Sequence, residues 1–247
     1  MRVLLDLYGV LLDSERMFRG YREEVARLLS SRYGGDRDAW LRAHDEAFVS
    51  YVRHVNDADW DAGRWIEIID RLDADNILEM FDRVGAANHP ADPLVLAREL
   101  EFEGMSRVDA RFPDARAAIE RVRGSGHKVY VATGASETNA RGALTGATLI
   151  GLIDGIFTEH SQNAVKARRR YWAPIPTALG VRPDECVLVD DRLDYLDAAA
   201  SVGILGLLLD RKGLHRTDSI PQSVQATLRS LAGLPQWLDT WESGKRR

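Results

Sequence analysis

The spacing of apolar residues changes twice along the 247-residue chain. The first run, Arg2 to Asp6, is short, apolar and ends at an acid, which is typical of a buried strand followed by a turn. From Ser14 to about residue 107, apolar residues recur every three or four positions, as they do on one face of a helix. From about residue 108, short apolar runs alternate with helical patterns. The pattern therefore predicts a strand, a helical segment and an alternating segment.

The helical segment divides into several predicted helices. The first runs from Ser14 to the Gly34–Gly35 pair, a natural helix end. Asp36 is placed to cap a second helix, which continues to about Val55. Further helical patterns cover residues 60–72, 76–84 and 93–103. This segment contains no strand pattern, so we expect it to form an all-helical domain.

The alternating segment predicts a parallel sheet. Its apolar runs predict strands at residues 127–133, 155–158, 186–190 and 204–208. The helical patterns around them cover residues 114–123, 137–145, 167–179, 193–201 and 221–232, and only residues 243–247 look disordered. Strands that alternate with helices indicate βαβ units with right-handed crossovers.

Together these patterns predict an α/β fold. A Rossmann-like parallel-sheet core, residues 1–13 and 108–247, would carry an inserted all-helical domain, residues 14–107. In open parallel sheets ligands bind at the carboxyl ends of the strands. Those ends carry Asp6, Thr133 and the pair Asp190–Asp191, so we expect these side chains to share one site.

Composition narrows the class of protein. Hydrophobic residues make up 45% and charged residues 29% of the chain, the balance of a folded globular protein. Apolar runs such as Gly203 to Leu209 are far shorter than the roughly 20 residues that cross a bilayer. The single cysteine, Cys186, allows no internal disulfide and suits a reducing compartment. We therefore expect a cytoplasmic protein that makes no membrane contact.

The charge is distributed unevenly. The net charge is −5, and residues 14–107 contain 13 arginines, no lysine and 20 acidic residues. Neither part of the chain has the basic surplus of a nucleic-acid binder. We expect the partner to be a small molecule.

The acids at the strand ends point to metal-assisted chemistry. Three converging carboxylates repel one another unless a cation lies among them, and oxygen ligands favour Mg²⁺. A metal that also bound a phosphate oxygen would let Asp6 attack phosphorus. Thr133 and Lys166 would then supply a hydrogen-bond donor and a fixed positive charge to the phosphoryl oxygens.

This order of residues resembles the haloacid dehalogenase-like (HAD) hydrolase superfamily, in the subgroup with a helical cap after the first motif. The segment from Leu4 to Val10 resembles its first motif, which implies that Asp6 is the nucleophile and that the main-chain carbonyl of Tyr8 binds the metal. Thr133–Gly134 resembles the second motif, and Lys166, 24 residues before Asp190, the third. Asp190–Asp191 resembles the acidic metal site of the fourth. The resemblance covers the whole predicted core.

Two positions depart from the pattern of the family's phosphatases. These enzymes usually carry a second aspartate two residues after the nucleophile, where this chain has Tyr8. A phenol with a pKa of about 10 is a poor base at neutral pH, so acid–base help at this position is in doubt. Tyr195, beside Asp194, stands where an acid or amide is common.

Tyr8 leaves alternative functions open. Asp-x-Tyr-Gly is typical of the 2-haloacid dehalogenases, whose aspartate attacks carbon and needs neither an acid nor a metal. That branch has Ser-Ser-Asn in place of the acid pair, however, so Asp190–Asp191 favours Mg²⁺ and phosphate. A degenerate member that only binds its ligand is a further alternative. A phosphonoacetaldehyde hydrolase type is excluded because residues 14–107 contain no lysine for a Schiff base.

We therefore predict a HAD-like hydrolase, a Mg²⁺-dependent phosphatase of a small phosphorylated metabolite. An aspartyl-phosphate would form on Asp6. The cap would close over the substrate, and Glu15, Phe18 and Arg19 near its hinge would contact it. The sequence is compatible with a monomer or a homodimer.

Overall fold

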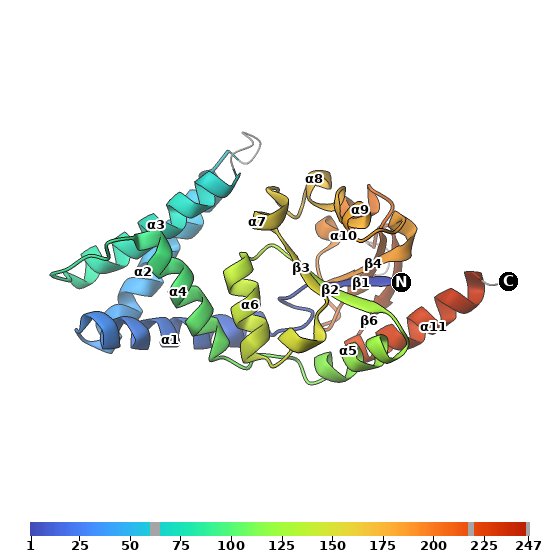
Figure 1. The fold of residues 1–247 in the computed structure, drawn as a ribbon, viewed down its shortest axis with the longest axis horizontal. Coiled ribbons are helices and arrows are strands. Elements are labelled where there is room, and N and C mark those ends of the chain that lie inside the picture. Colours follow the sequence, from blue (N-terminus) through green and yellow to red (C-terminus); the bar gives the residue numbers. More distant parts are fainter. Residues whose placement is uncertain (60–64, 217–219, 246–247) are drawn as a thin grey trace. The chain divides into compact units, whose positions relative to one another are not determined.

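A computed structural model describes residues 1–59, 65–216 and 220–245. Its sheet has six strands in the order β3-β2-β1-β4-β5-β6, and every pair of neighbours is parallel (Figure 1). The strands are β1 (Arg2–Leu5), β2 (Lys128–Thr133), β3 (Gly155–Thr158), β4 (Cys186–Asp190), β5 (Leu205–Leu209) and β6 (Val224–Leu228). The predicted α/β fold with a parallel sheet is thus confirmed.

The strand register explains why the polar strand ends meet. Leu5 pairs with Val131 on one side and with Val189 on the other. The next residue, Asp6, donates its N–H to the Val189 carbonyl at 3.0 Å, so it lies level with the end of β4. Parallel strands place their carboxyl ends at one edge of the sheet. The polar residues that follow β1, β2 and β4 therefore share that edge.

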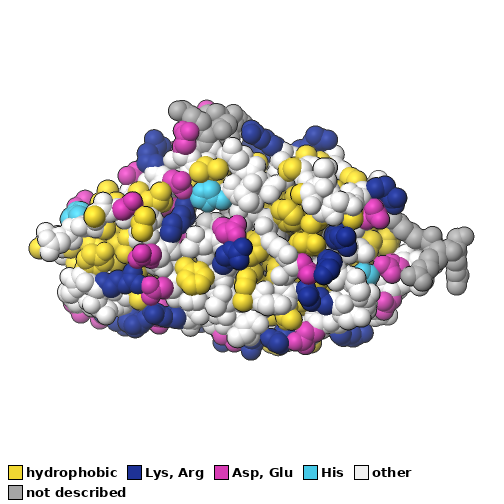
Figure 2. Space-filling model, in the orientation of Figure 1, with side chains coloured by type: hydrophobic (Ala, Val, Ile, Leu, Met, Phe, Trp, Pro, Cys, Tyr) yellow, Lys and Arg dark blue, Asp and Glu magenta, His cyan; other side chains and the backbone are white. Residues whose placement is uncertain are grey.

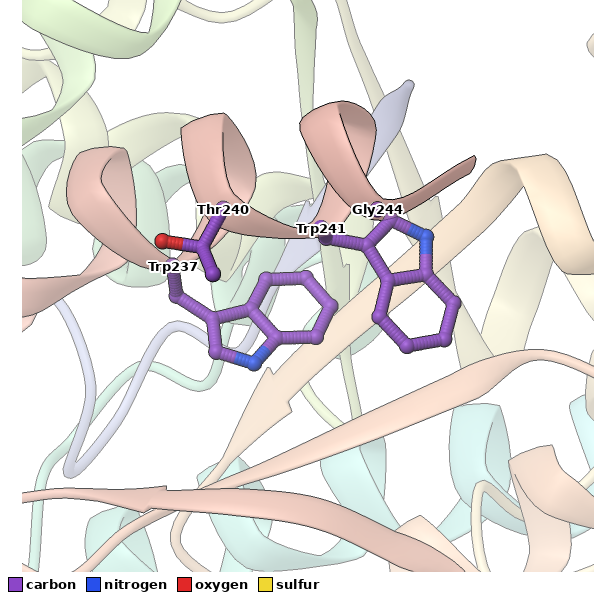
Figure 3. Close-up of a pocket in the computed structure, with 4 residues that line it drawn as sticks. All are labelled: Trp237, Thr240, Trp241 and Gly244. Atoms are coloured by element: carbon purple, nitrogen blue, oxygen red, sulfur yellow. The ribbon is translucent and has the colours of Figure 1, made fainter. Parts of the chain in front are cut away.

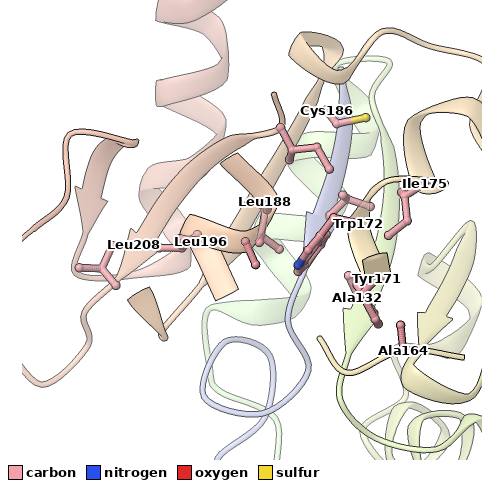
Figure 4. Close-up of a cluster of buried hydrophobic side chains, with 13 residues drawn as sticks. Ala132, Ala164, Tyr171, Trp172, Ile175, Cys186, Leu188, Leu196 and Leu208 are labelled. Atoms are coloured by element: carbon pink, nitrogen blue, oxygen red, sulfur yellow. The ribbon is translucent and has the colours of Figure 1, made fainter. Parts of the chain in front are cut away.

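Helices cover both faces of the sheet. Helices α8 (Arg169–Trp172), α9 (Ile175–Ala178) and α10 (Leu193–Ala200) lie on one face, and α5 (Ala115–Gly124) and α11 (Leu234–Lys245) on the other (Figure 1). Figure 4 shows the core under the first group, where Tyr171 and Trp172 pack among apolar side chains of the strands. Tyr171 and Trp172 are fully buried in this core, which fixes the chain segment that follows Lys166.

A second compact unit is helical. It contains α1 (Ser14–Tyr33), α2 (Arg37–Asp57), α3 (Trp65–Val84), α4 (Pro93–Ser106) and α6 (Glu137–Gly146). Its own core includes the ring contacts of Trp40 and Phe81. Helix α1 ends at Gly34 and Gly35, both with positive φ, and Asp36 caps α2 by accepting the Ala39 N–H, as the sequence predicts.

The units are bounded differently from the predicted domains. The α/β unit comprises residues 1–14, 111–136 and 149–247, and the helical unit residues 15–110 and 137–148. Helix α6, which the sequence analysis assigned to the core, thus belongs to the helical unit. It packs closely on α4, because a Cβ on Gly142 would lie only 2.8 Å from the Phe102 carbonyl oxygen. Glycine at this position permits the close approach of the two helices.

Three predicted elements were wrong in extent. The helical patterns at 60–72 and 76–84 belong to one helix over the described residues, α3, while residues 60–64 lie outside the described part of the chain. The helix predicted at 167–179 is instead the two short helices α8 and α9. Pro174 and Pro176 explain the break, since proline removes a backbone donor and restricts the preceding residue.

The carboxyl-terminal region was also predicted wrongly. Residues 221–232, predicted as a helix, contain the edge strand β6, whose half-buried and exposed residues alternate. This alternation has the period of a strand with one covered face. Residues 243–245, predicted to be disordered, continue helix α11.

Helix α11 carries an apolar hollow of about 300 Å³ (Figure 3). Trp237 and Trp241, whose rings stack with centroids 5.3 Å apart, line it with Thr240 and Gly244. On the same helix, Glu242 lies 3.7 Å from His127, just before the start of β2. The hollow is therefore on the helix that contacts the amino end of β2, and the polar residues described above lie at the carboxyl ends of the strands.

The surface carries charges of both signs. Figure 2 shows Lys and Arg side chains interspersed with Asp and Glu over the face in view. Within the described ranges, no helix is long and apolar enough to cross a membrane.

Candidate active site

Three carboxylates meet at the polar edge of the sheet. Asp6 follows β1, and Asp190 ends β4 and precedes Asp191. One oxygen of each carboxylate lies within 4.8 Å of the others, so the three could hold a metal ion. Asp6 and Asp190 are buried, with 6% and 0% of their surfaces exposed. The structure thus brings together the three acids that the sequence analysis selected.

Lys166 lies between two of these acids. Its Nζ donates to Asp6 Oδ1 at 2.6 Å and to Asp190 Oδ2 at 2.7 Å, and the side chain is fully buried. Burial by itself lowers the pKa of Lys166, but attraction to Asp190 and Asp6 outweighs it and raises that pKa above its usual value. Lys166 is therefore a fixed positive charge at neutral pH.

The positive charge of Lys166 does not balance the negative charge of the three acids. Burial raises the pKa of Asp190, an effect that Lys166 opposes and Asp6 increases. Burial, followed by repulsion from Asp6, also raises the pKa of Asp191. Three carboxylates with one ammonium leave an excess of negative charge, and hard oxygen donors suit Mg²⁺. The donor set present here fits that ion.

The turn after β1 brings main-chain groups close to the acids. Gly9 has a φ of +86°, and a Cβ at this position would lie 2.1 Å from Asp191 Oδ2, so only glycine fits. Gly9 therefore passes beside Asp191, while a metal contact of the Tyr8 carbonyl stays a prediction. The Arg211 guanidinium holds the turn by donating to the Gly9 and Val10 carbonyls at 3.3 and 2.8 Å.

Thr133 ends the neighbouring strand β2 and is 1% exposed. Its Oγ1 accepts the Ala135 N–H at 3.2 Å, which leaves the hydroxyl proton available for donation. Its carbonyl accepts a hydrogen bond from Tyr171 Oη at 3.1 Å. Gly134, the next residue, is exposed.

Glu159 was missed by the sequence analysis. It directly follows the last residue of β3, and Thr158 at that end pairs with Thr133. A Cβ on Gly134 would lie 3.4 Å from Glu159 Oε1. The rule that selected Asp6 and Asp190, an acid at the carboxyl end of a strand, selects Glu159 as well. The strand at 155–158 carries this signal in the sequence.

Aromatic rings surround the Lys166 side chain. Its Nζ lies 4.6 Å from the centroid of Tyr195 and 5.9 Å from that of Trp172. The Arg192 guanidinium lies 4.4 Å from the same Tyr195 ring. Tyr195, which departs from the family pattern, is thus a contact of two cations rather than an acid or amide ligand.

The remaining predicted residues belong to the helical unit. Glu15, Phe18 and Arg19 lie on α1, and all three are exposed. Their contact with a substrate stays a prediction.

Comparison with known proteins identifies the family. A family model described as haloacid dehalogenase-like hydrolase matches residues 1–203. The chain belongs to this family of hydrolases. The match includes the three acids of the site, Thr133, Glu159 and Lys166, and ends before Arg211.

Individual relatives of this hydrolase carry two kinds of name. Phosphatase MT3486 of Mycobacterium tuberculosis is 33% identical over 155 residues, which are 58% of this chain and 68% of that protein. A HAD phosphatase from Thermococcus onnurineus superposes with a TM-score of 0.63 and 22% identity, covering 96% of this chain and 97% of the other. A 2-haloacid dehalogenase from Pseudomonas syringae pv. Tomato superposes with a TM-score of 0.68 and 18% identity, covering 98% and 100%. The two structures support the fold alone.

Proposed function

We propose that this hydrolase is a Mg²⁺-dependent phosphatase of a small phosphorylated metabolite. The observation that carries the proposal is the acid cluster, in which Asp190 and Asp191 lie within 4.8 Å of Asp6. Without a cation this excess of carboxylates would repel any anionic substrate, whether a phosphate ester or a haloacid. The relative named Phosphatase MT3486 supports the same substrate class.

In the proposed reaction Asp6 attacks the phosphorus atom. The new bond joins an Asp6 oxygen to phosphorus, and the bond from phosphorus to the alcohol oxygen breaks with its electron pair. Water then attacks phosphorus, releases phosphate and restores the carboxylate. Asp6, Asp190, Asp191 and the Tyr8 carbonyl would bind Mg²⁺, which when bound offsets the charge of the phosphoryl oxygens.

Other residues of the chain would hold the phosphoryl group. The Thr133 hydroxyl and the Gly134 N–H would donate hydrogen bonds to its oxygens. Lys166, already charged and buried, would stabilise the negative charge of the transition state. Because Lys166 also contacts Asp6 at 2.6 Å, it would fix the position of the nucleophile.

Tyr8 limits the proposed reaction. No carboxyl stands two residues after Asp6 to protonate the departing alcohol. We therefore propose that the enzyme prefers esters with good leaving groups. The helical unit would act as the cap, and Glu15, Phe18 and Arg19 would select the substrate.

Tyr8 also favours a second function, that of a metal-independent 2-haloacid dehalogenase. Asp6 would then attack carbon, and halide would leave without a proton. The third candidate function is that of a protein that binds its ligand without turnover.

One set of assays separates these functions. The wild type and Asp6→Asn are incubated with p-nitrophenyl phosphate or 2-chloropropionate, each with Mg²⁺ and with EDTA. The proposal predicts phosphate release that requires both Mg²⁺ and Asp6. Chloride release that survives EDTA would replace it with the dehalogenase function, and no turnover of either substrate would favour a binding protein.

A further inference from the structure

The main chain of Lys166 is held on both sides of its Cα by side chains. Its N–H donates to Glu159 Oε1 at 2.6 Å. Its carbonyl accepts a hydrogen bond from Trp172 Nε1 at 2.8 Å. Lys166 lies between the short helices α7 (Glu159–Gln162) and α8, outside any helix or strand, so no regular backbone pairing fixes it. These two side chains therefore supply the orientation that secondary structure does not.

Trp172 and Glu159 differ in how they are themselves held in place. Trp172 is fully buried in the core of Figure 4, so it is a rigid donor. Glu159 directly follows β3 and lies against Gly134, beside the Thr133 turn. Its carboxylate thus lies beside the Thr133–Gly134 turn and accepts the hydrogen bond of the Lys166 N–H, two elements that the proposed mechanism uses.

The surroundings of Glu159 show that its place is electrostatically costly. Burial raises the pKa of Glu159 to about 7, with Asp6 adding to the rise and the Lys166 N–H, Lys166 charge and Arg192 opposing it. Glu159 in turn adds to the burial that raises the pKa of Tyr171 and of Tyr195. A buried acid beside other acids is tolerated when the hydrogen bond it accepts fixes a group the protein needs.

We propose that Glu159 is a positioning residue, whose Oε1 fixes the Lys166 peptide and so keeps the Lys166 ammonium between Asp6 and Asp190. The role in catalysis rests on the proposed function above, whereas the positioning itself does not. The requirement is an acceptor oxygen at the end of a side chain of this length. Glutamine meets this requirement, and alanine and methionine do not.

Acetylation of lysine amines tests the positioning without any assay of activity. The metal-free wild type, Glu159→Ala, Glu159→Met and Glu159→Gln are pulsed with an acetylating ester, and the extent at each lysine is measured by peptide mass spectrometry. Lys128 and Lys212, both exposed, serve as internal references. Thermal unfolding is measured first, and whichever of Glu159→Ala and Glu159→Met retains a cooperative transition is used.

We expect Lys166 of the wild type and of Glu159→Gln to be acetylated slowly, because the amine is fully buried and paired. Loss of the acceptor should speed acetylation of Lys166 about tenfold or more by local opening, with no change at Lys128 or Lys212. An unchanged rate at Lys166 in the Ala or Met variant would overturn the proposal. So would equal acceleration in Glu159→Gln, since the acceptor is then not what matters.

Kinetics test the consequence for catalysis. With p-nitrophenyl phosphate and Mg²⁺, loss of the acceptor should lower kcat by about 10- to 100-fold, as is typical of residues that orient a site group, and glutamine should restore most of it. Glu120→Ala, which removes an exposed glutamate of α5, is the matched control and should leave kcat unchanged. Equal kcat in all variants would overturn the proposal that this positioning contributes to catalysis. If the wild type turns over no phosphate ester, the proposed function fails, while acetylation still decides the positioning.

Discussion

Lys166 keeps its charge without contact with solvent because two carboxylates surround it. Its Nζ lies 2.6 and 2.7 Å from oxygens of Asp6 and Asp190. Burying one ion of such a group is costly, and removing its partner leaves the remaining charge uncompensated. The same arrangement serves a nucleophile, since the ammonium holds the Asp6 carboxylate in place. At the scale of the residue, stability and chemistry therefore depend on the same contacts.

Replacement of Lys166 should destabilise the protein strongly. Lys166→Met leaves two buried carboxylates facing each other, so the free energy of unfolding of the metal-free protein at pH 7 should fall by about 3–5 kcal/mol. Lys128→Met is the matched control, because Lys128 pairs with Asp154 at the surface, and it should cost less than about 1 kcal/mol. Urea unfolding measures both. Equal losses for the two variants would contradict this account of Lys166.

Glu159 should make stability depend on pH. Its folded pKa of about 7 lies above the ordinary value of a glutamate, so the folded state binds more protons than the unfolded state between these values. The contribution of Glu159 to stability is complete below about pH 4.5 and is lost as pH rises toward and through 7, by at most about 3 kcal/mol. Glu159→Gln lacks this loss. In metal-free protein it should unfold like the wild type at pH 5 and be more stable at pH 8, whereas the same difference at both values would argue against the raised pKa.

Tyr8 should limit the departure of poor leaving groups. Tyr8→Asp restores a carboxyl two residues after Asp6, so it should raise activity on alkyl phosphates by about tenfold or more, and raise activity on p-nitrophenyl phosphate much less. Rates of phosphate release with Mg²⁺ check this. Equal effects on both esters would show that Tyr8 does not limit the departure of the alcohol.

At the scale of elements, the sequence predicted those with a clear period and missed those decided by tertiary contacts. The strands of the sheet centre are continuous apolar runs, and β1, β2, β4 and β5 lie where they were expected. The edge strand β6 has an alternating pattern in place of a continuous apolar run, so a neighbouring helical pattern obscured it. The assignment of α6 to the helical unit depends on its packing against α4, which no local pattern reveals.

The packing of α6 against α4 gives a prediction at this scale. A Cβ on Gly142 would lie 2.8 Å from the Phe102 carbonyl oxygen and 2.9 Å from Met105 Cβ, so Gly142→Ala must push the helices apart. It should cost about 1–3 kcal/mol of unfolding free energy. Gly124→Ala, at the end of α5 with nothing within 4 Å of the added atom, is the control and should be neutral or slightly stabilising. Urea unfolding that shows no difference between the two would contradict close packing at Gly142.

At the scale of the whole molecule, a parallel sheet collects acids from distant parts of the sequence at one edge. Sequence reasoning placed Asp6, Thr133, Asp190 and Asp191 there because each ends a strand. Lys166 was selected by its spacing, but its complete burial could not be foreseen, since the aromatic core around it is formed by helices predicted as one. Tyr8 and the acid pair point to different chemistries on the same fold. The central question is therefore whether Asp6 attacks phosphorus or carbon.

The most direct measurement follows the oxygen atoms. The protein turns over p-nitrophenyl phosphate with Mg²⁺, and separately 2-chloropropionate, in ¹⁸O-labelled water, after which the released phosphate and the peptide that contains Asp6 are weighed by mass spectrometry. A phosphatase whose water attacks phosphorus should give ¹⁸O-labelled phosphate and leave Asp6 unlabelled. Transfer of ¹⁸O into Asp6 during turnover of 2-chloropropionate, with no labelled phosphate from the ester, would contradict the proposed function.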